Sequence, residues 1–565
     1  MIRDDLKRLI EAAVERATAS GDLPAVALPE VVLEHPAKAE LGDFATNVAM
    51  RMQKAAGMPP RNVAGAITHH LELPGAVSTV EVAGPGFINF FLADEWLQDQ
   101  VDVILDEGPA FGRVPLGKGA RVQVEFVSAN PTGPLHVGAA RNAALGDSLA
   151  RVLALTDHIV EREYYFNDAG SRIEALGASV WARYRQLHGV EASFPEEGYQ
   201  GEYILELARD IAAQEGRSLL ELPPDEVVAR MARLAVERVM GWIERDLADL
   251  GVRFDRWYTE QSLYDGELFE TAMQLLRERG HVVEREGAVW FTSPDLGEDG
   301  DAVLVRSNGQ PTYFASDVAY HYDKFIIRGY DRAIDVVSSD HQGHVPRMFA
   351  MVKALGVDPE RLVMLVYQMV KLFEGGQEVK MSKRAGTFVT VRDLLDAVGA
   401  DAARYFLLSR SADVTMNFDL DLARRQSDEN PVYYVQYAHA RTASIFREAA
   451  NKLGNAEYAD GDVRLLATES ELTLIRKLLR FPEVVESAAS TLAPHQLTFY
   501  VLDLAGAFSA FYRDCPVLPP RNPDDGLTRA RLKLVAATKQ VLASCLDLLG
   551  VSAPERMAER VLEGV

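Results

Sequence analysis

Residues 124 to 147 read VEFVSANPTGPLHVGAARNAALGD, and this stretch decides the fold at the centre of the chain. The segment 122–127, VQVEFV, predicts a buried strand, Pro and Gly mark a tight turn, and Ala and Leu at helical spacing predict a helix over 139–155. A strand, a turn and a helix bring backbone N–H groups and a helix N-terminus together. Such a turn favours binding of an anion such as phosphate.

Strands and helices alternate on the C-terminal side of this stretch. We expect strands at 159–166, 333–338 and 362–367, and helices at 169–187, 315–325 and 345–355. The alternation indicates a parallel sheet with crossover helices. The sequence predicts long charged helices within residues 190 to 300 and a hairpin at 281–291, and we interpret this segment as an insertion. From residue 391 we expect helices to the end of the chain.

Residues 1–110 form an opening unit of helices and strands, followed by a linker. In that linker, the segment 112–119 nearly matches a phosphate-binding loop. The match fails because Gly119 stands where a hydroxyl should bind Mg²⁺, and a strand follows where a helix should begin. We therefore interpret this segment as a connector.

Length and composition predict several domains, since 565 residues exceed what one hydrophobic core supports. No apolar run is long enough to cross a bilayer, and the N-terminus lacks a signal peptide, so we expect a cytoplasmic protein without membrane partners. Cys515 and Cys545 are the only cysteines, which argues against a disulfide scaffold and against a structural zinc.

The net charge of −24 argues at first against a nucleic-acid partner. Its distribution changes that argument. Residues 430–565 hold 15 Lys and Arg against 16 Asp and Glu, so this part carries −1 and the rest −23. The C-terminal part could therefore present a local basic face. The alternative is that the negative charge of the rest of the chain serves only its solubility.

His136 and Gly138 stand at the start of the predicted helix after the turn. An imidazole there can donate to a phosphate oxygen whose charge builds during displacement, and Gly138 lets a nucleotide approach the backbone. In an isolated His-x-Gly motif, the histidine more often caps a helix or packs in the interior. The position of this motif in the first strand–helix turn of a nucleotide-binding fold favours the catalytic interpretation.

Lys380-Met381-Ser382-Lys383 lies in a loop flanked by glycines. Two lysines three residues apart can hold a triphosphate and its leaving pyrophosphate. The alternative is a solvated basic loop. The two motifs in this order are far more specific than either alone.

Together the motifs resemble the signatures of class I aminoacyl-tRNA synthetases. Further strings are similar to the arginyl-tRNA synthetase family of the bacterial type: EFVSANPTGPLHVG, YFNDAGSRI, SDHQGHVPRM, KMSKRAGTFVTVRDL, ENPVYYVQYAHAR and APERM. The opening unit, with LGDFATNVAM and GPGFINFFL, resembles the N-terminal domain special to that family. The resemblance covers the chain from end to end.

The resemblance implies a multidomain α/β plus all-α protein, with a Rossmann-like parallel-sheet catalytic domain, an N-terminal α+β domain and a C-terminal helical bundle that binds the anticodon. The expected boundaries are 1–110 for the N-terminal domain that contacts tRNA, 111–390 for the catalytic domain with its insertion at about 190–300, 391–429 for a helical connector and 430–565 for the anticodon-binding domain. The implied reaction activates L-arginine with ATP to arginyl-adenylate and pyrophosphate, then transfers arginine to the 3′ end of tRNA(Arg).

The resemblance also implies the residues of the site. Those for ATP are Pro134, His136, Gly138, Ala139, Lys380, Met381, Ser382 and Lys383, with His136, Lys380 and Lys383 catalytic. Those for arginine are Glu125, Ser128, Asn130, Tyr313, Asp317, His341 and Gln342. We expect Mg²⁺ only as a companion of ATP, tRNA bound before arginine is activated, and a monomer.

Physical chemistry supports an arginine pocket, because a guanidinium binds carboxylates in a plane, ideally beside an aromatic ring. Tyr313 and Asp317 are four residues apart at a predicted helix start, so they face the same side. Asp317 could instead only stabilise the helix dipole. His341 and His344 have a chelating spacing, but no third or fourth ligand is evident nearby in the sequence, so we expect no metal site.

In the C-terminal part, aromatic residues alternate with arginines, a pattern that suits stacking on unpaired bases. We expect tRNA contacts at Tyr433, Tyr437, Arg441 and Met557. Tyr433 and Tyr437 are also at the spacing of a helix core.

One position departs from the class I pattern, because Ala139 replaces the second histidine of the motif. That second imidazole usually supports the nucleotide, so its absence leaves open what takes over its share of ATP stabilisation. Two alternatives stay open at this point. One is a small-molecule nucleotidylyltransferase, which rarely needs a long helical C-terminal part. The other is a catalytically inactive RNA-binding relative, against which the intact Lys380–Lys383 motif and the carboxylates argue.

Overall fold

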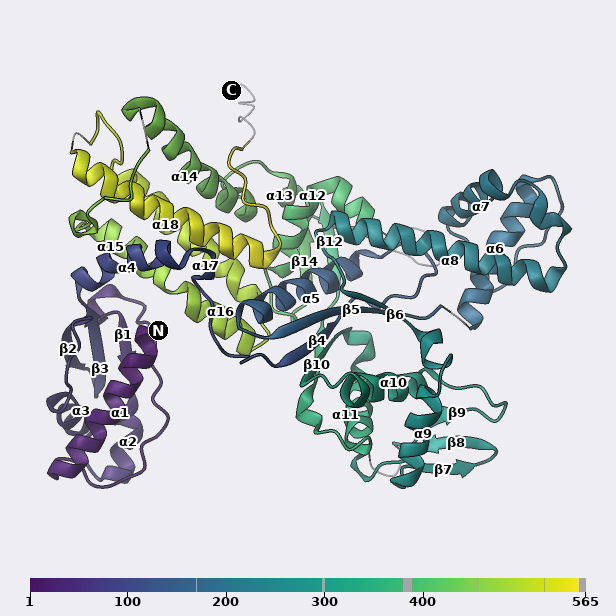
Figure 1. Ribbon diagram of the computed structural model, residues 1–565, viewed down its shortest axis with the longest axis horizontal. Coiled ribbons are helices and arrows are strands. Elements are labelled where there is room, and N and C mark those ends of the chain that lie inside the picture. The colour runs from purple at the N-terminus through teal and green to yellow at the C-terminus, as the bar shows by residue number, and fades with distance from the viewer. Residues whose placement is uncertain (169, 297–299, 380–388, 455, 523, 558–565) are drawn as a thin grey trace. The chain divides into compact units, whose positions relative to one another are not determined.

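The computed structural model describes residues 1–168, 170–296, 300–379, 389–454, 456–522 and 524–557. The chain divides into two compact units (Figure 1). The first comprises residues 1–111, 438–482 and 503–542, and the second residues 112–437, 483–502 and 543–565. In the described residues, no helix is long and apolar enough to cross a membrane.

The first unit opens with an amphipathic helix, α1 (Ile2–Ser20), which buries Leu6, Ile10 and Ala17 on one face and ends at the left-handed Gly21. A three-stranded antiparallel sheet follows, in the order β1-β3-β2. The elements of this part are, in chain order, β1 (Phe44–Thr46), α2 (Val48–Ala56), α3 (Pro60–His69), β2 (Val77–Ala83), β3 (Phe87–Leu92) and α4 (Asp94–Glu107). The helix α15 (Glu469–Leu479) packs against α4 in the same unit.

The second unit is built on a five-stranded parallel sheet in the order β11-β10-β4-β5-β6. Its strands are β4 (Arg121–Glu125), β5 (Ile159–Phe166), β6 (Arg256–Thr259), β10 (Arg332–Ser338) and β11 (Leu362–Tyr367). Val122, Gln123 and Val124 of the central strand are all buried, as expected for a strand covered on both faces. The predicted alternation of strands and helices is confirmed.

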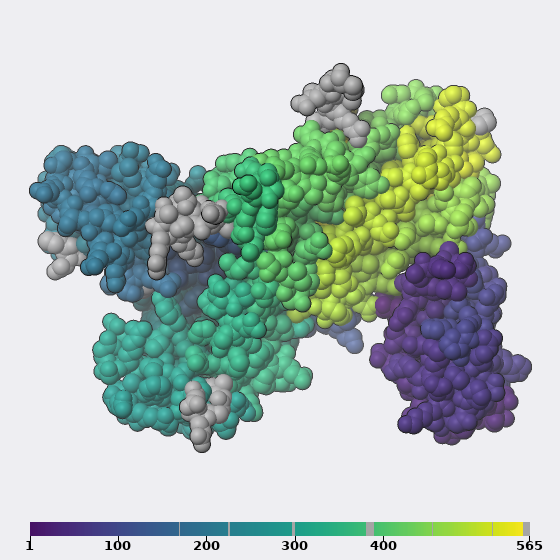
Figure 2. Space-filling model, turned by 180° about the vertical axis from the view of Figure 1, so that it is seen from behind, coloured from purple at the N-terminus to yellow at the C-terminus, as the bar shows by residue number. Residues whose placement is uncertain are grey.

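The helices α5 (Val137–Leu155) and α11 (Val345–Ala354) connect strands of this sheet in the predicted order. The segment predicted as an insertion contains β6, which pairs with β5, so one edge of the main sheet comes from within it. The rest of the segment packs with elements on either side of it in the sequence to form two bodies. One is a lobe of α6 (Ser171–Leu187), α7 (Glu202–Glu215) and α8 (Pro224–Asp249), coloured blue in Figure 2.

The other body packs α9 (Leu268–Glu278) and α10 (Tyr313–Tyr322) together with a small antiparallel sheet of three strands. These strands are β7 (Val282–Arg285), β8 (Ala288–Phe291) and β9 (Ala302–Val305). The first two form the predicted hairpin. A π-helical turn, Asp323–Ile327, extends α10 and shifts its register by one residue.

The expectation of helices alone after residue 391 is wrong. Residues Met416–Asp419 form β14, which pairs in parallel with β12 (Val370–Glu374), and β13 (Gln377–Glu378) completes that sheet. Four residues of alternating burial are too short a pattern to distinguish from a helix segment. The remaining elements are helices: α12 (Val391–Leu408), α13 (Leu420–Arg424), α14 (Pro431–Leu453), α16 (Phe481–Ser490), α17 (His495–Asp514) and α18 (Asp525–Leu549).

Candidate active site

The turn after β4 is held in an unusual backbone conformation. Val127 and Ser128 have φ angles of 67° and 42°, which side-chain-bearing residues rarely adopt. Asn142 of α5 accepts a hydrogen bond from the Val127 N–H at 2.8 Å, and the buried Tyr164 hydroxyl donates to the Ala129 carbonyl at 2.9 Å. Backbone strain that neighbouring groups stabilise in this way is typical of functional sites.

His136 is the N-cap of α5, which agrees with the interpretation of this residue as a capping histidine. Its Nδ1 accepts a hydrogen bond from the Gly138 N–H at 3.0 Å. Since Nδ1 is an acceptor, the proton of the neutral ring lies on Nε2. The cap therefore fixes the tautomer that could donate to a phosphate, and the two interpretations are compatible.

The backbone beside His136 is paired with a segment far along the chain. The Val137 N–H donates to the Val389 carbonyl at 3.0 Å, and the Val391 N–H donates to the Leu135 carbonyl at 2.8 Å. The predicted phosphate-binding residues Lys380, Met381, Ser382 and Lys383 lie outside the described residues. The chain that follows them is thus joined to the first motif by backbone hydrogen bonds.

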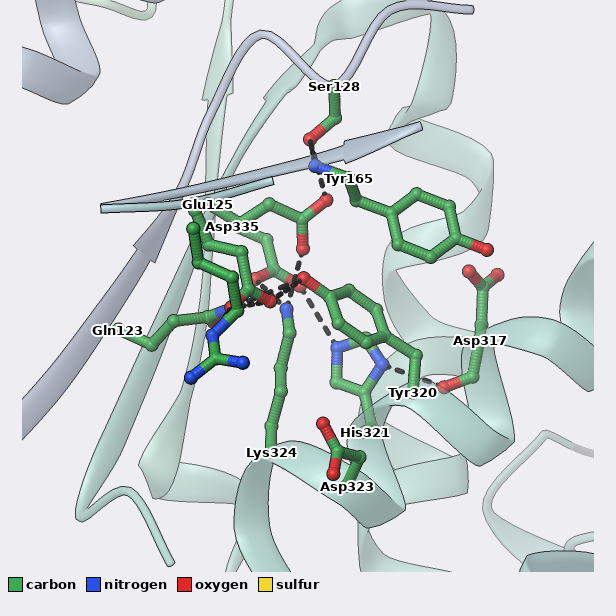
Figure 3. Close-up of polar contacts among 12 residues, drawn as sticks. Gln123, Glu125, Ser128, Tyr165, Asp317, Tyr320, His321, Asp323, Lys324 and Asp335 are labelled. Carbon is green, nitrogen blue, oxygen red and sulfur yellow. Dashed lines mark hydrogen bonds and ion pairs between the residues drawn. The ribbon is translucent and has the colours of Figure 1, made fainter. Parts of the chain in front are cut away.

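Glu125, which the sequence assigns to the substrate, is engaged by a cation of the chain itself (Figure 3). The fully buried Lys324 donates from Nζ to Glu125 at 2.6 Å and to Asp335 at 2.8 Å. Burial lowers the pKa of Lys324, but the two carboxylates outweigh it and raise this pKa. Burial raises the pKa of Glu125, whereas Lys324 and His321 hold that of Asp335 far below its usual range despite burial.

Ser128 links this cluster to the next strand. Its hydroxyl donates to Glu125 at 2.9 Å and accepts from the Tyr165 N–H at 3.2 Å. Behind it, the buried Glu163 binds Arg328 and accepts from Gln123 at 2.8 Å. The interior beside β4, β5 and β10 therefore holds carboxylates that are paired with Lys324 and Arg328.

A second group of carboxylates lies next to this cluster. Asp317, one turn along α10 from Tyr313, is partly buried, and burial together with the charges of Glu125 and Asp335 raises its pKa to about 7. In Figure 3 its carboxylate lies beside the Tyr165 hydroxyl. Among the described residues, no Lys or Arg forms an ion pair with Asp317. A carboxylate that burial destabilises in this way favours binding of a cation.

Glu260 shares the neighbours Tyr165 and Tyr264 with Asp317 and was not identified from the sequence. It follows β6 directly and is only 8% exposed, and burial raises its pKa although Ser316 and Tyr165 donate hydrogen bonds to it. Tyr264 contacts the Ser316 hydroxyl at 2.7 Å. An acidic residue at the carboxyl end of a strand was the available signal, but β6 was not recognised as part of the sheet.

A cavity of about 550 Å³ lies over the turn that carries His136. Among the predicted residues, Asn130, Pro134, His136 and Ala139 line it. Asn130, predicted for the α-groups of arginine, therefore shares one cavity with three residues predicted for ATP, whereas Glu125 and Asp317 lie among the charged groups of Figure 3.

Other predicted residues lie elsewhere. His341 and Gln342 are exposed on a 3₁₀ turn, Ser339–His344, after β10, on the opposite side of β4 from β5. Tyr313, the first residue of α10, is 55% exposed. In the described residues, no group of three or more His, Cys, Asp or Glu is arranged to hold a metal.

The C-terminal candidates differ in exposure. Tyr433 is 9% exposed and stacks on Tyr437, with ring centroids 6.4 Å apart. Arg441 lies over the Tyr512 ring at 5.1 Å, and Met557 is partly exposed. A buried ring cannot stack on a base unless its helix moves, so Tyr433 is a core residue here.

Comparison with known protein families gives three adjoining matches. Residues 4–92 match the arginyl tRNA synthetase N terminal domain, residues 100–442 the catalytic domain of class I (R) tRNA synthetases, and residues 435–557 the DALR anticodon binding domain. The catalytic match alone spans more than half of the chain.

Individual relatives agree with these matches. The chain is 46% identical to the arginine–tRNA ligase of Dehalococcoides mccartyi over 98% of this chain and 99% of that one, and 48% identical to that of Syntrophotalea carbinolica over 98% and 100%. Among solved structures, the arginyl-tRNA synthetase of Thermus thermophilus superimposes with a TM-score of 0.77 at 27% identity, covering 99% of this chain and 100% of that chain.

Proposed function

The chain belongs to the arginyl-tRNA synthetase family of class I, and we propose that it is an arginine–tRNA ligase whose substrate is chosen at Asp317. The arginine carboxylate attacks the α-phosphorus of ATP, giving arginyl-adenylate and pyrophosphate. A ribose hydroxyl at the 3′ end of tRNA(Arg) then attacks the carbonyl carbon of the adenylate, and AMP leaves. Catalysis rests on positioning and on stabilisation of charge.

The observation that carries this proposal is the difference in pairing among the carboxylates. Glu125 and Asp335 share the ammonium of Lys324, so both are already engaged within the chain. Asp317, with its raised pKa, and Glu260 beside it remain without a cation of the chain. An incoming guanidinium would supply the missing charge and bind both carboxylates through its fork of N–H donors.

The remaining predicted arginine contacts fall into two roles. Tyr313, at the exposed rim, is placed to cover the guanidinium with its ring. Asn130 lines the cavity, and Ser128 orders the turn through Glu125 and Tyr165, so we assign these two to the α-amino and carboxylate groups. Glu125 acts by holding Ser128. His341 and Gln342 are proposed for the α-groups from the family resemblance alone.

ATP binds over the first motif. We propose that His136, with its proton on Nε2, donates to a phosphate oxygen, while Pro134, Gly138 and Ala139 allow the nucleotide to approach the backbone. Lys380 and Lys383, with Met381 and Ser382 between them, hold the leaving pyrophosphate. Mg²⁺ enters bound to the phosphates of ATP. Ala139 offers no donor, so the phosphates depend more on His136 and the two lysines.

The domains and partners follow the same proposal. We assign residues 1–110 and 430–565 to contacts with tRNA, 111–390 to catalysis and 391–429 to a connector, with Tyr437, Arg441 and Met557 among the tRNA contacts. We propose that the protein acts in the cytoplasm as a monomer.

The test is ATP–pyrophosphate exchange with each amino acid, with and without tRNA(Arg), followed by aminoacylation. We expect exchange with arginine and not with lysine, because lysine offers no planar pair of donors. Exchange without any transfer to tRNA would indicate a small-molecule nucleotidylyltransferase. Binding of tRNA without either reaction would indicate an inactive RNA-binding protein.

A further inference from the structure

The hydroxyl of Tyr165, on β5, lies beside both carboxylates that the guanidinium is proposed to bind, and its part in the site is still unassigned. In Figure 3 this hydroxyl lies next to the carboxylate of Asp317. It also donates a hydrogen bond to Glu260. A group that binds the two carboxylates together therefore comes close to this oxygen as well.

The ring of Tyr165 is held in place by two other aromatic rings. It packs against Tyr320 of α10, with ring centroids 4.7 Å apart, and stacks on Tyr258 of β6 at 6.1 Å. Its backbone N–H donates to the Ser128 hydroxyl at 3.2 Å. Because these contacts remove most of the freedom of the side chain, its hydroxyl has a defined position before a substrate enters, and binding costs little ordering.

The proton of this hydroxyl is already committed within the chain. Burial and the charges of Glu260 and Asp317 raise the pKa of Tyr165, so the phenol stays protonated. Its proton lies in the hydrogen bond to Glu260. Since a hydroxyl has one donor and two acceptor lone pairs, the oxygen can only accept from a further partner. Tyr165 therefore presents a neutral acceptor to the pocket.

A second hydroxyl fixes Glu260 together with Tyr165. Ser316, which is buried on α10, also donates to Glu260. The Tyr264 hydroxyl lies 2.7 Å from that of Ser316, and because the single proton of Ser316 goes to Glu260, Tyr264 donates to Ser316. The hydroxyl protons are thus directed at Glu260, and the lone pairs of Tyr165 stay available to a substrate.

The donors of a guanidinium call for such an acceptor. An arginine side chain carries five N–H donors in one plane and no acceptor. Asp317 can pair with two of them in a fork, whereas Glu260 already accepts two hydroxyl protons and has only part of its capacity left. A donor that is buried without an acceptor would lower the affinity. The ammonium of a lysine side chain has three donors and makes a smaller demand.

We propose that the hydroxyl oxygen of Tyr165 accepts one N–H of the arginine guanidinium, and that it thereby helps the site to prefer a guanidinium to an ammonium. A neutral acceptor suits this place, because a further unpaired carboxylate beside Asp317 and Glu260 would add to the cost of burying like charges. This inference rests on the proposed function and adds a specificity-determining residue to its arginine pocket.

The test uses agmatine and cadaverine, which are arginine and lysine without their carboxylates, so they can bind but cannot be activated. Their inhibition constants are measured against arginine in pyrophosphate exchange with tRNA(Arg) present. We expect Tyr165→Phe to raise the inhibition constant of agmatine about 10-fold, as the loss of one hydrogen bond to a charged group predicts. The constant for cadaverine should be unchanged, since the two carboxylates satisfy its ammonium.

Tyr258→Phe is the matched control. Tyr258 stacks on Tyr165, but its own hydroxyl forms hydrogen bonds with Ser262 and Asp323 instead of Glu260. Each substitution removes one hydroxyl and keeps the ring and its packing. Tyr258→Phe should leave both inhibition constants unchanged. Thermal melting of the two variants shows whether a change in binding is one of folding.

A double variant separates direct contact from an effect through Glu260. If Tyr165 accepts from the guanidinium, Tyr165→Phe combined with Glu260→Gln should weaken agmatine beyond Glu260→Gln alone. Equal constants for these two variants would mean that Tyr165 acts only by orienting Glu260, and would overturn the inference.

Two further outcomes are decisive. An equal rise in both inhibition constants in Tyr165→Phe would indicate a distorted pocket and overturn the inference, as would an unchanged constant for agmatine. Failure of the unaltered protein to charge tRNA(Arg) at all would instead remove the proposed function.

Discussion

The two carboxylate groups at the carboxyl end of the sheet differ in what neutralises them. Glu125 and Asp335 are 14% and 7% exposed and share the ammonium of Lys324. Burial raises the pKa of Asp317 and Glu260, as it does that of Glu125, but among the described residues no Lys or Arg forms an ion pair with either of them. The first group is paired within the chain, whereas the second carries the charge that, as we propose, an arginine guanidinium neutralises.

The largest effect should come from breaking the satisfied group. Lys324→Met would leave at least one buried carboxylate unpaired, and we expect a loss of about 3–5 kcal/mol in the free energy of unfolding. Chemical denaturation of the full chain would measure it.

The double variant Lys324→Met with Glu125→Gln should recover part of this loss, because one buried charge is removed with its partner. Lys371→Met is the matched control, since its pair with Glu378 is about half exposed and contributes about 0–1 kcal/mol. If both lysine variants lose the same stability, the distinction between the two groups of carboxylates is wrong.

Asp317→Asn should have the next largest effect, on arginine rather than on stability. The amide keeps the size of the side chain but loses the charge that pairs with the guanidinium. We expect the KM for arginine to rise about 100-fold, equivalent to about 2.7 kcal/mol, with the KM for ATP unchanged. Steady-state kinetics of exchange measure both constants. A melting temperature equal to or above that of the unaltered protein is expected, since an uncompensated buried charge is removed.

Glu260→Gln should act in the same direction and less strongly. Glu260 already accepts hydrogen bonds from Ser316 and Tyr165, so part of its capacity is used within the chain. We expect the KM for arginine to rise about 10-fold. An effect larger than that of Asp317→Asn would make Glu260 the principal anchor and Asp317 its support.

The sequence pointed to Asp317 but not to Glu260, and it did not indicate that Glu125 has a partner within the chain. Asp317 was identifiable because it lies one helical turn from Tyr313 in a motif of the family. Glu260 was not, since it follows β6, a strand of four residues inside a segment of charged helices. Short strands at a sheet edge lack the alternation that identifies longer ones.

The partner of Glu125 was also beyond the sequence. Lys324 lies 199 residues further along, and the folded sheet brings it to its carboxylates and buries it there. By contrast, the parallel sheet and the His136 turn were predictable, because each depends on periodicity and turn residues within about 30 positions.

The smallest expected effect is a dependence of arginine binding on pH. Asp317 has a pKa of about 7 in the free protein, raised first by burial and then by Glu125 and Asp335, while His321 and Lys324 lower it. A bound guanidinium favours the ionised form, so arginine binding lowers this pKa and releases a proton. Affinity is therefore highest above pH 7 and falls as the pH drops through 7.

Between pH 7.5 and 6.5 the ionised fraction of a group with this pKa falls about threefold, so the KM for arginine should rise about threefold over that interval. Exchange kinetics across this range would show it, with the KM for ATP as the internal control. In Asp317→Asn the same profile should be flat, because the titrating group is gone. A profile that persists in Asp317→Asn would place the titration on another group and leave Asp317 ionised throughout, as Asp335 is in the satisfied cluster.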